Sequence, residues 1–528
     1  MKKKSLLAAG VQLSFLTLIS RVLGLVREVT KAYFLGTSAL ADAFGIAFMI
    51  PNLFRRLFAE NSISVAFIPT FKAYLEGSDT PQGRQETQDF VNATCTLVTF
   101  LTTVVVVLGI CLTPFIIPLF YKDGDASVLQ ETTLLTRIMF PYLLVISVAA
   151  FFQGILNGLK IFAPSGFTPI LFNVIVIAAT YLLSPLTANP ARAMAIGVIT
   201  GGVVQAIFQL PFVLNSGWKV SLTTLKKALS NPGTKKVVTL VGPTIIGMAA
   251  YQLNDVVSTS LAGRAGTGVV SSLQYSLRLQ ELILGIFAVS IGTVILPDMA
   301  GLAKKQQWEE FSAMLTQSVK IIALITIPIT FFSLITGEKI ISLVYKSNNF
   351  DQESVRLTLE AFAFHIAGLF FIAVNRIISP AFYAQGNTKS PATAGILGFA
   401  VNILLALLLV GSMKGGGIAL ALTLASLANT IFLLIFLQRT RRFAMGTVVK
   451  GMIGYALKMV VLSLIASIPL LLLKDRLFSL FSFNSRILQE GIPLIMAALL
   501  FAAVGGLLLL ITRDSLTQLI VKKLRRRI

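Results

Sequence analysis

Long apolar stretches recur along the whole chain, and they constrain its fold more than any other feature. The 528 residues are 55% hydrophobic and only 12% charged, and the mean hydropathy is +0.84. Soluble domains carry charge on about a quarter of their residues, so this composition is typical of a membrane protein. The stretches are continuous rather than alternating with a period of two, which favours spanning helices over a β-barrel. We therefore predict an all-α polytopic membrane protein.

Apolar segments between polar breaks predict about fourteen transmembrane helices. Their first residues lie near Gln12, Ala41, Phe90, Thr133, Thr168, Ala193, Val237, Val270, Phe311, Leu357, Pro391, Ile418, Tyr455 and Pro493. The first segment follows a Lys-rich start but carries Arg21 and Arg27, and it lacks a small-residue cleavage site. We therefore expect it to be a retained helix rather than a signal peptide.

The distribution of Lys and Arg predicts the orientation of these helices. Of the 44 Lys and Arg residues, 24 fall on the side of the two termini, 10 on the opposite side and 10 inside the predicted helices. Positive residues concentrate in cytoplasmic loops, so we expect both termini on the cytoplasmic side. The formal net charge of +22 then reflects topology and contact with anionic lipid rather than binding of nucleic acid.

The chain also contains an internal repeat. The sequence SISVAFIP at 62–69 recurs as SIGTVILP at 290–297, an offset of 228, and three further Gly or Pro pairs share an offset of 227 or 228. The repeat predicts two parallel six-helix lobes, 1–228 and 229–450, followed by two additional helices and a basic cytoplasmic tail in 451–528. Transporters built from such repeats place their binding site between the repeats.

Arginines inside the predicted helices are the strongest functional signal. A charge at the bilayer centre costs about 2.5–3.5 kcal/mol on insertion scales, so such residues line a hydrated cavity or pair with a carboxylate. The set comprises Arg21 and Arg27 in the first helix, Arg55 after Pro51 in the second, and Arg278 in the eighth. The planar guanidinium group can donate two parallel hydrogen bonds to a phosphate, which predicts a cavity for a diphosphate or another polyanion.

The alternative is that these arginines form salt bridges between helices or extend to the cytoplasmic surface. Candidate carboxylate partners are Glu28, Asp42, Glu60 and Glu281. Asp255 is a candidate for a coupling cation or proton, with help from Asn402, or else it stabilises a helix pair. For His365 we favour a hydrogen bond between helices over a proton relay. The sequence has no phosphate-binding nucleotide loop, no nucleophile–base arrangement and no Cys/His cluster, so we expect no enzyme activity, no cofactor and no metal.

One long run of sequence resembles a known family. The segment 20–69, SRVLGLVREVTKAYFLGTSALADAFGIAFMIPNLFRRLFAENSISVAFIP, is similar to the signature of the MurJ/MviN family. Members are lipid II flippases of peptidoglycan synthesis, within the multidrug/oligosaccharidyl-lipid/polysaccharide exporter superfamily. The segment FPYLLVISVAAFFQGILNG at 140–158, the pair Gly242-Pro243 and SIGTVILP extend the resemblance along the chain.

The resemblance implies two lobes around a central cationic cavity that work by alternating access, with a groove for the polyprenyl tail on the last two helices. By motif position, the functional residues of the family fall on Arg21, Arg27, Asp42, Arg55, Glu60 and Arg278. Two positions depart from the family pattern, because Asn61 replaces a usual glycine and Leu277 replaces a frequent aspartate. Some members have a cation site in helices seven, eleven and twelve, where Asp255 is the available carboxylate.

The arginines and the resemblance together predict a lipid II flippase of the bacterial inner membrane. It would move the undecaprenyl-diphosphate-linked peptidoglycan precursor from the inner to the outer leaflet, using a membrane potential or an ion gradient. Expected partners are lipid II, membrane lipids and other proteins of cell-wall synthesis. The alternatives are a flippase for another lipid-linked glycan, a drug exporter of the same superfamily, an intramembrane enzyme acting on polyprenyl diphosphates, and a lipid-binding scaffold.

Overall fold

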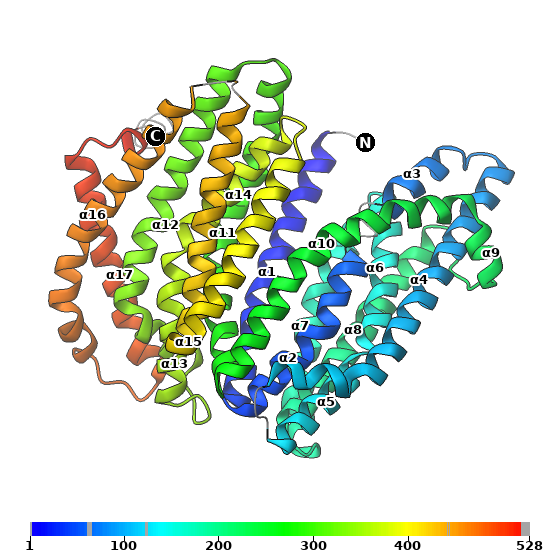
Figure 1. The fold of residues 1–528 in the computed structure, drawn as a ribbon, viewed down its shortest axis with the longest axis horizontal. Coiled ribbons are helices and arrows are strands. Elements are labelled where there is room, and N and C mark those ends of the chain that lie inside the picture. Colours follow the sequence, from blue (N-terminus) through cyan, green and yellow to red (C-terminus); the bar gives the residue numbers. More distant parts are fainter. Residues whose placement is uncertain (1–2, 61–65, 122–124, 441, 443, 519–528) are drawn as a thin grey trace. The chain divides into compact units, whose positions relative to one another are not determined.

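The computed structural model describes residues 3–60, 66–121, 125–440, 442 and 444–518. Within these ranges, only the backbone is described for residues 3–11, 58–60, 243–244, 246–251 and 286–294. All regular secondary structure in the described residues is helical (Figure 1), which confirms the predicted all-α class. The chain separates into two compact units, Met1–Ser271 and Ser272–Ile528.

The first unit contains the helices up to the start of α11. They are α1 (Lys3–Leu35), α2 (Ala39–Phe54), η1 (Arg55–Glu60), α3 (Ile68–Glu76), α4 (Pro81–Ile116), η3 (Ile117–Phe120), α5 (Ala126–Met139), α6 (Tyr142–Gly158), α7 (Ala163–Leu183), η4 (Ser184–Leu186), α8 (Pro190–Asn215), α9 (Leu225–Ser230) and α10 (Pro232–Ala265). The second unit contains most of α11 (Val269–Lys304), then α12 (Trp308–Tyr345), α13 (Gln352–Ala367), α14 (Leu369–Tyr383), α15 (Lys389–Arg439), α16 (Met445–Ser479) and α17 (Arg486–Ile511).

Eight helical segments in the described part of the chain are long and apolar enough to cross a membrane, and a bent pair makes a ninth. They are α4 with η3, α5 with α6, α7 with η4, α8, α12, α15, α16 and α17, and the bent pair is α13 with α14. At 51 residues, α15 would measure about 76 Å if straight, far beyond a hydrocarbon core of about 30 Å. Its backbone leaves helical geometry at Lys414, between the two helices predicted from Pro391 and Ile418. The total of fourteen stays a prediction.

Helix α2 is buried almost all round, which fixes the position of the charged residues at its two ends. It begins after Ser38, whose hydroxyl oxygen accepts a hydrogen bond from the backbone N–H of Ala41 at 3.3 Å. Residues Ala41–Ala47 are all buried, and the helix packs against α5. At its other end the chain widens into the π-helical turn η1, a feature often found at functional sites.

The segment between α8 and α9 is held against α4 by a regular series of hydrogen bonds. Backbone N–H groups of alternate residues donate to side chains one helical turn apart. The pairs are Lys219 with Gln88, Ser221 with Asn92, and Thr223 with Thr96, at 3.1, 3.1 and 2.9 Å. Two residues of extended chain advance about 6.6 Å and four residues of helix about 6 Å, so the two repeats match. This match fixes where α9 and α10 begin.

In the second unit, the long helix α12 packs against α13, α14, α16 and α17. Helices α16 and α17 run beside each other and beside α12 (Figure 1). Their contact is a buried cluster of Ala466 and Leu470 from α16 with Ala497 and Phe501 from α17. These are the two additional helices that the sequence predicts at the end of the chain.

The compact units and the predicted lobes divide the chain at different places. The units divide at Ser271, so α10 belongs to the first unit, where it contacts α2, α4 and η3. The repeat instead places the boundary at 228, because it records similarity of sequence rather than density of contacts. The segments 1–228, 229–450 and 451–528 stay predictions, and the basic tail beyond Gln518 lies outside the described residues.

Candidate functional site

Asp42 is a buried carboxylate at the start of α2, with only 3% of the residue exposed. Its two oxygens accept hydrogen bonds from the backbone N–H groups of Gly268 (2.6 Å) and Ser271 (2.7 Å). These groups belong to the first turn of α11, whose N–H groups have no partner within the helix. The negative charge also complements the positive end of the helix dipole. Asp42 therefore fastens the N-terminus of α2 to that of α11.

Lys31 lies near Asp42 and is also buried, at 3% exposed. Its ammonium group interacts electrostatically with Glu28 and Asp42 and lies 6.0 Å from the centre of the Phe44 ring. The sequence alone did not single out Lys31. Its spacing of three residues from Glu28 on one helix was a usable signal, because residues three apart lie on the same face.

Arg27 is largely buried on α1, and neighbouring groups of the protein already contact it. Its Nη2 atom lies 2.9 Å from the carboxylate of Glu28, and the two side chains are 20% and 16% exposed. The guanidinium group also lies 6.0 Å from the centre of the Phe48 ring and 5.6 Å from that of Phe172. The ion pair lies within α1, so it is not a salt bridge between helices, and together these contacts hold the guanidinium group in one place.

Arg21 differs from Arg27, although both lie on α1. It is half-buried and makes no ion pair or hydrogen bond with the residues that the structure describes. Six residues separate the two arginines, which puts their directions about 120° apart around the helix. Arg21 is therefore the predicted site residue whose charge is open to a ligand.

The turn η1 carries Arg55 and Arg56, which differ in their contacts. Arg55 donates from Nε to the side-chain oxygen of Asn52 at 2.7 Å. Arg56 reaches α10, where its Nη1 atom lies 3.1 Å from Asp255 and 3.4 Å from Gln252. Asp255, the candidate for a coupling cation, is thus engaged by a cation of the protein, and its side chain is 47% exposed.

In the second unit, Arg278 lies on α11 and pairs with Glu281 one turn later. The Nη1–Oε2 distance is 3.3 Å, and the side chains are 29% and 59% exposed. A pair this exposed contributes little free energy, so the guanidinium group can exchange its partner for a ligand. Asn402 is buried in α15, at 2% exposed. The side chain of Glu60 and all of Asn61 lie outside the described residues.

A second buried acid lies near the end of the described chain. Asp514 is 1% exposed and accepts hydrogen bonds from Lys458 Nζ at 2.8 Å and from the hydroxyl of Tyr455 at 3.1 Å. Burial alone would raise the pKa of Asp514, but these bonds and one from the backbone N–H of Thr517 hold it below its ordinary value. Lys458 thus anchors the chain after α17.

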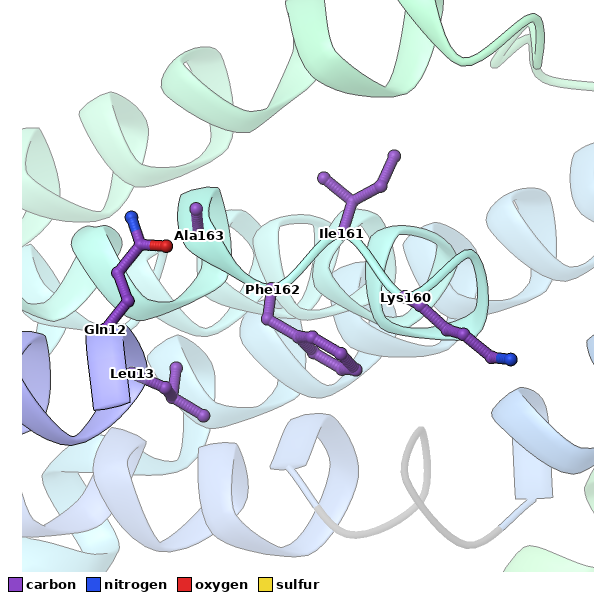
Figure 2. A pocket seen from close by; sticks show the side chains of 6 residues that line it. All are labelled: Gln12, Leu13, Lys160, Ile161, Phe162 and Ala163. Carbon is purple, nitrogen blue, oxygen red and sulfur yellow. The ribbon is translucent and has the colours of Figure 1, made fainter. Parts of the chain in front are cut away.

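The first unit also contains a cavity of about 290 Å³, between the start of α1 and the turn that joins α6 to α7. Gln12 and Leu13 line it from α1, and residues 160–163 line it from the turn (Figure 2). Apart from Gln12 and Lys160 the described lining is apolar, and none of the predicted site residues whose side chains are described contributes to it.

Comparison with known proteins shows the family of this chain. The family model described as "Lipid II flippase MurJ" matches residues 31–489. The chain belongs to the MurJ family. It is 45% identical over 525 residues to "Probable lipid II flippase MurJ" of Treponema pallidum (strain Nichols), covering 99% of each chain. It is 32% identical over 444 residues to "Lipid II flippase MurJ" of Burkholderia cenocepacia, covering 82% of this chain and 84% of the relative.

Solved structures give the same family and a wider fold group. "Lipid II flippase MurJ, inward closed conformation" matches with a TM-score of 0.77 and 25% identity, covering 94% of this chain and 99% of the other. An inward-facing multidrug resistance MATE family transporter of the MOP superfamily matches with a TM-score of 0.67 and 15% identity, covering 84% of this chain and 99% of the other. The second match shows a shared fold alone.

We predict that Asp42→Asn destabilises the MurJ-family chain. The amide keeps one acceptor oxygen but turns an NH₂ group toward a backbone N–H, which leaves a buried donor without a partner, at a cost of about 1–3 kcal/mol. The thermal unfolding midpoint of the purified protein in detergent measures the effect. Asp89→Asn is the matched control, because Asp89 is exposed and accepts a bond from Gln85. Equal midpoints for the two variants would contradict the role of Asp42.

The pair Arg56–Asp255 gives a second prediction. If Asp255 serves this pair, Asp255→Asn and Arg56→Gln each lower the free energy of unfolding by no more than about 1 kcal/mol, because the pair is half-exposed. The double variant should then be as stable as either single variant. If Asp255 binds a coupling cation instead, added Na⁺ should raise the unfolding midpoint, more strongly in Arg56→Gln and not in Asp255→Asn. Titration of NaCl against choline chloride at constant ionic strength separates the two outcomes.

Proposed function

We propose that this chain is a lipid II flippase, a transporter that moves the lipid-linked peptidoglycan precursor across the membrane. The family match over residues 31–489 and the relatives named as lipid II flippases support this function. The chain is a multi-pass membrane protein, and its role is transport rather than catalysis. Its substrate is lipid II, and it contacts membrane lipids.

Arg21 is the residue that most directly supports this function. It is a half-buried cation on α1, which the sequence predicts to be the first transmembrane helix, and it has no ion pair among the described residues. Its surroundings in sequence are cationic, because residues 20–60 hold five basic and three acidic residues, a net charge of +2. The diphosphate of lipid II, esterified at both ends, carries about two negative charges. The net charges match, and guanidinium groups suit phosphate oxygens in geometry.

We assign the arginines to the diphosphate and the carboxylates to the scaffold that holds them. Arg21, Arg55 and Arg278 would donate hydrogen bonds to phosphate oxygens, while Arg27 is positioned by Glu28 and two aromatic rings. Asp42 would hold the ends of α2 and α11 together in one state of the transport cycle and release them in another. Glu60 stays in this proposal on the strength of its motif position alone.

We also propose a membrane location and an energy source for this transporter. The excess of Lys and Arg on the side of the termini supports cytoplasmic termini in a bacterial inner membrane. Moving a net charge through the bilayer couples transport to the membrane potential at about 2.3 kcal/mol per charge per 100 mV. A role in cell-wall synthesis would bring the protein close to other proteins of that process.

Complementation tests the proposed function. The chain is expressed in a bacterium depleted of its own lipid II flippase, and lipid II at the outer leaflet is detected by an added toxin that cleaves it. We expect rescue by the wild-type chain and a loss of about tenfold or more in outer-leaflet lipid II for Arg21→Ala and Arg278→Ala, because a charge-assisted hydrogen bond contributes about 1.5–3 kcal/mol. Arg21→Lys should recover part of the loss.

Arg84→Ala is the matched control, because Arg84 is exposed and stacks on Trp218 away from the intramembrane charges. Rescue by Arg21→Ala and Arg278→Ala at the wild-type level would remove these arginines from the site. Failure of the wild-type chain, despite normal insertion, would move the substrate to another lipid-linked glycan.

A further inference from the structure

The helix pair α13–α14 is broken in the interior of the second unit, and carbonyls beside the break accept hydrogen bonds from neighbouring helices in addition to those from the backbone N–H of Gly368. The two helices bend by 42° around Gly368. A methyl group on Gly368 would collide with the hydroxyl of Thr423 on α15, so the break is packed tightly against that helix. A break in a helix disturbs the regular backbone bonds, and side-chain donors of neighbouring helices can then bond to the carbonyls beside it.

Three neighbouring helices supply those donors, one for each of three consecutive carbonyls. Thr423 of α15 donates to the carbonyl of Phe364 at 2.7 Å, and Thr330 of α12 donates to that of Ile366 at 3.1 Å. Between them, the side-chain amide of Gln280 on α11 donates to the carbonyl of His365.

Helix α11 makes a second contact with the same residue. The hydroxyl of Ser276 and Nδ1 of His365 share a hydrogen bond at 2.6 Å, which confirms the hydrogen bond between helices that the sequence predicted for His365. Ser276, Gln280 and His365 are 0%, 2% and 1% exposed. Ser276 and Gln280 are four residues apart and lie on one face of α11. Together with His365 they form what we call the α11 lock.

Arg278 lies between the two lock residues in sequence and on the other side of the helix. Each step of two residues turns an α-helix by about 200°, so Arg278 points away from the lock. The burial pattern agrees, because Gln274, Leu277, Arg278 and Glu281 form the less buried stripe of α11 while Ser276 and Gln280 are buried. Rotation of α11 would displace the arginine and break two buried hydrogen bonds at once, which makes it costly.

We infer that Gln280 and Ser276, held by the broken turn at His365, are positioning residues that set the direction in which Arg278 presents its guanidinium group to the substrate. This inference rests on the proposed function, because it takes lipid II as the ligand of Arg278. The lock touches no ligand itself and acts through the rotation of α11.

Binding of lipid II to purified protein in nanodiscs tests the inference. Gln280→Met keeps the length of the side chain and removes its donor, and Ser276→Ala removes the second contact. Each should weaken binding of lipid II by about fivefold, in the range of coupling between residues of one network. In an Arg278→Ala background the same changes should weaken binding by less than twofold, because the arginine on which they act is gone.

Thr423→Val and Thr330→Val are the matched controls. Each removes one hydrogen bond to a carbonyl of the same broken turn, but neither residue lies on α11. We expect both to lower the unfolding midpoint as much as Gln280→Met does and to leave lipid II affinity unchanged. An equal loss of affinity in the threonine variants, or an undiminished effect of Gln280→Met in the Arg278→Ala background, would overturn the inference.

A second measurement needs no lipid II and so separates this inference from the proposed function. A nitroxide is attached to Arg278→Cys in a chain whose two cysteines, Cys95 and Cys111, are replaced by alanine. Gln280→Met should increase the mobility of the label, and Thr423→Val should not. If wild-type protein fails to bind lipid II, the proposed function fails while the label still reports on the lock. Unchanged mobility in Gln280→Met overturns the lock itself.

Discussion

The cost of placing a charge in the bilayer interior is the constraint on which the rest of this structure depends. A buried cation or carboxylate there must be hydrated, paired or bound to a ligand. Most of the charged side chains on α1, α2 and η1 have partners within the protein, and these partners are of three kinds. Asp42 receives two backbone N–H groups, Arg27 has Glu28 and two aromatic rings, and Arg56 has Asp255. Arg21 has no such partner among the described residues, and this exception points to a substrate.

The cost of burying polar groups also determines how the helices are held together. The carboxylate of Asp42 is buried, and it fastens two helix ends by accepting hydrogen bonds from the backbone N–H groups of Gly268 and Ser271. In the second unit, the broken turn at His365 performs a similar task, because its carbonyls accept hydrogen bonds from side chains of three neighbouring helices. Buried polar groups therefore fix the contacts between helices in both units.

The sequence predicts those features that depend on local chemistry. Apolar composition predicts helices, and the cost of burial selects Arg21 and Arg278 before any contact is known. The sequence does not predict which residues pair when they are far apart in the chain. Arg56 and Asp255 are 199 residues apart, and their contact depends on the packing of η1 against α10. The lock at Gln280 was missed for the same reason. Lys31 was missed although its spacing from Glu28 is visible in the sequence.

We propose above all that arginines of this chain bind the diphosphate of lipid II. The most direct test of this proposal is the Kd of the purified protein in nanodiscs for lipid II and for the same lipid-linked glycopeptide with a single phosphate. Loss of one phosphate removes at least one charge-assisted bond, so we predict binding of lipid II at least about tenfold tighter. Equal affinity for the two lipids would contradict the account, because recognition would then rest on the sugar, the peptide or the polyprenyl tail.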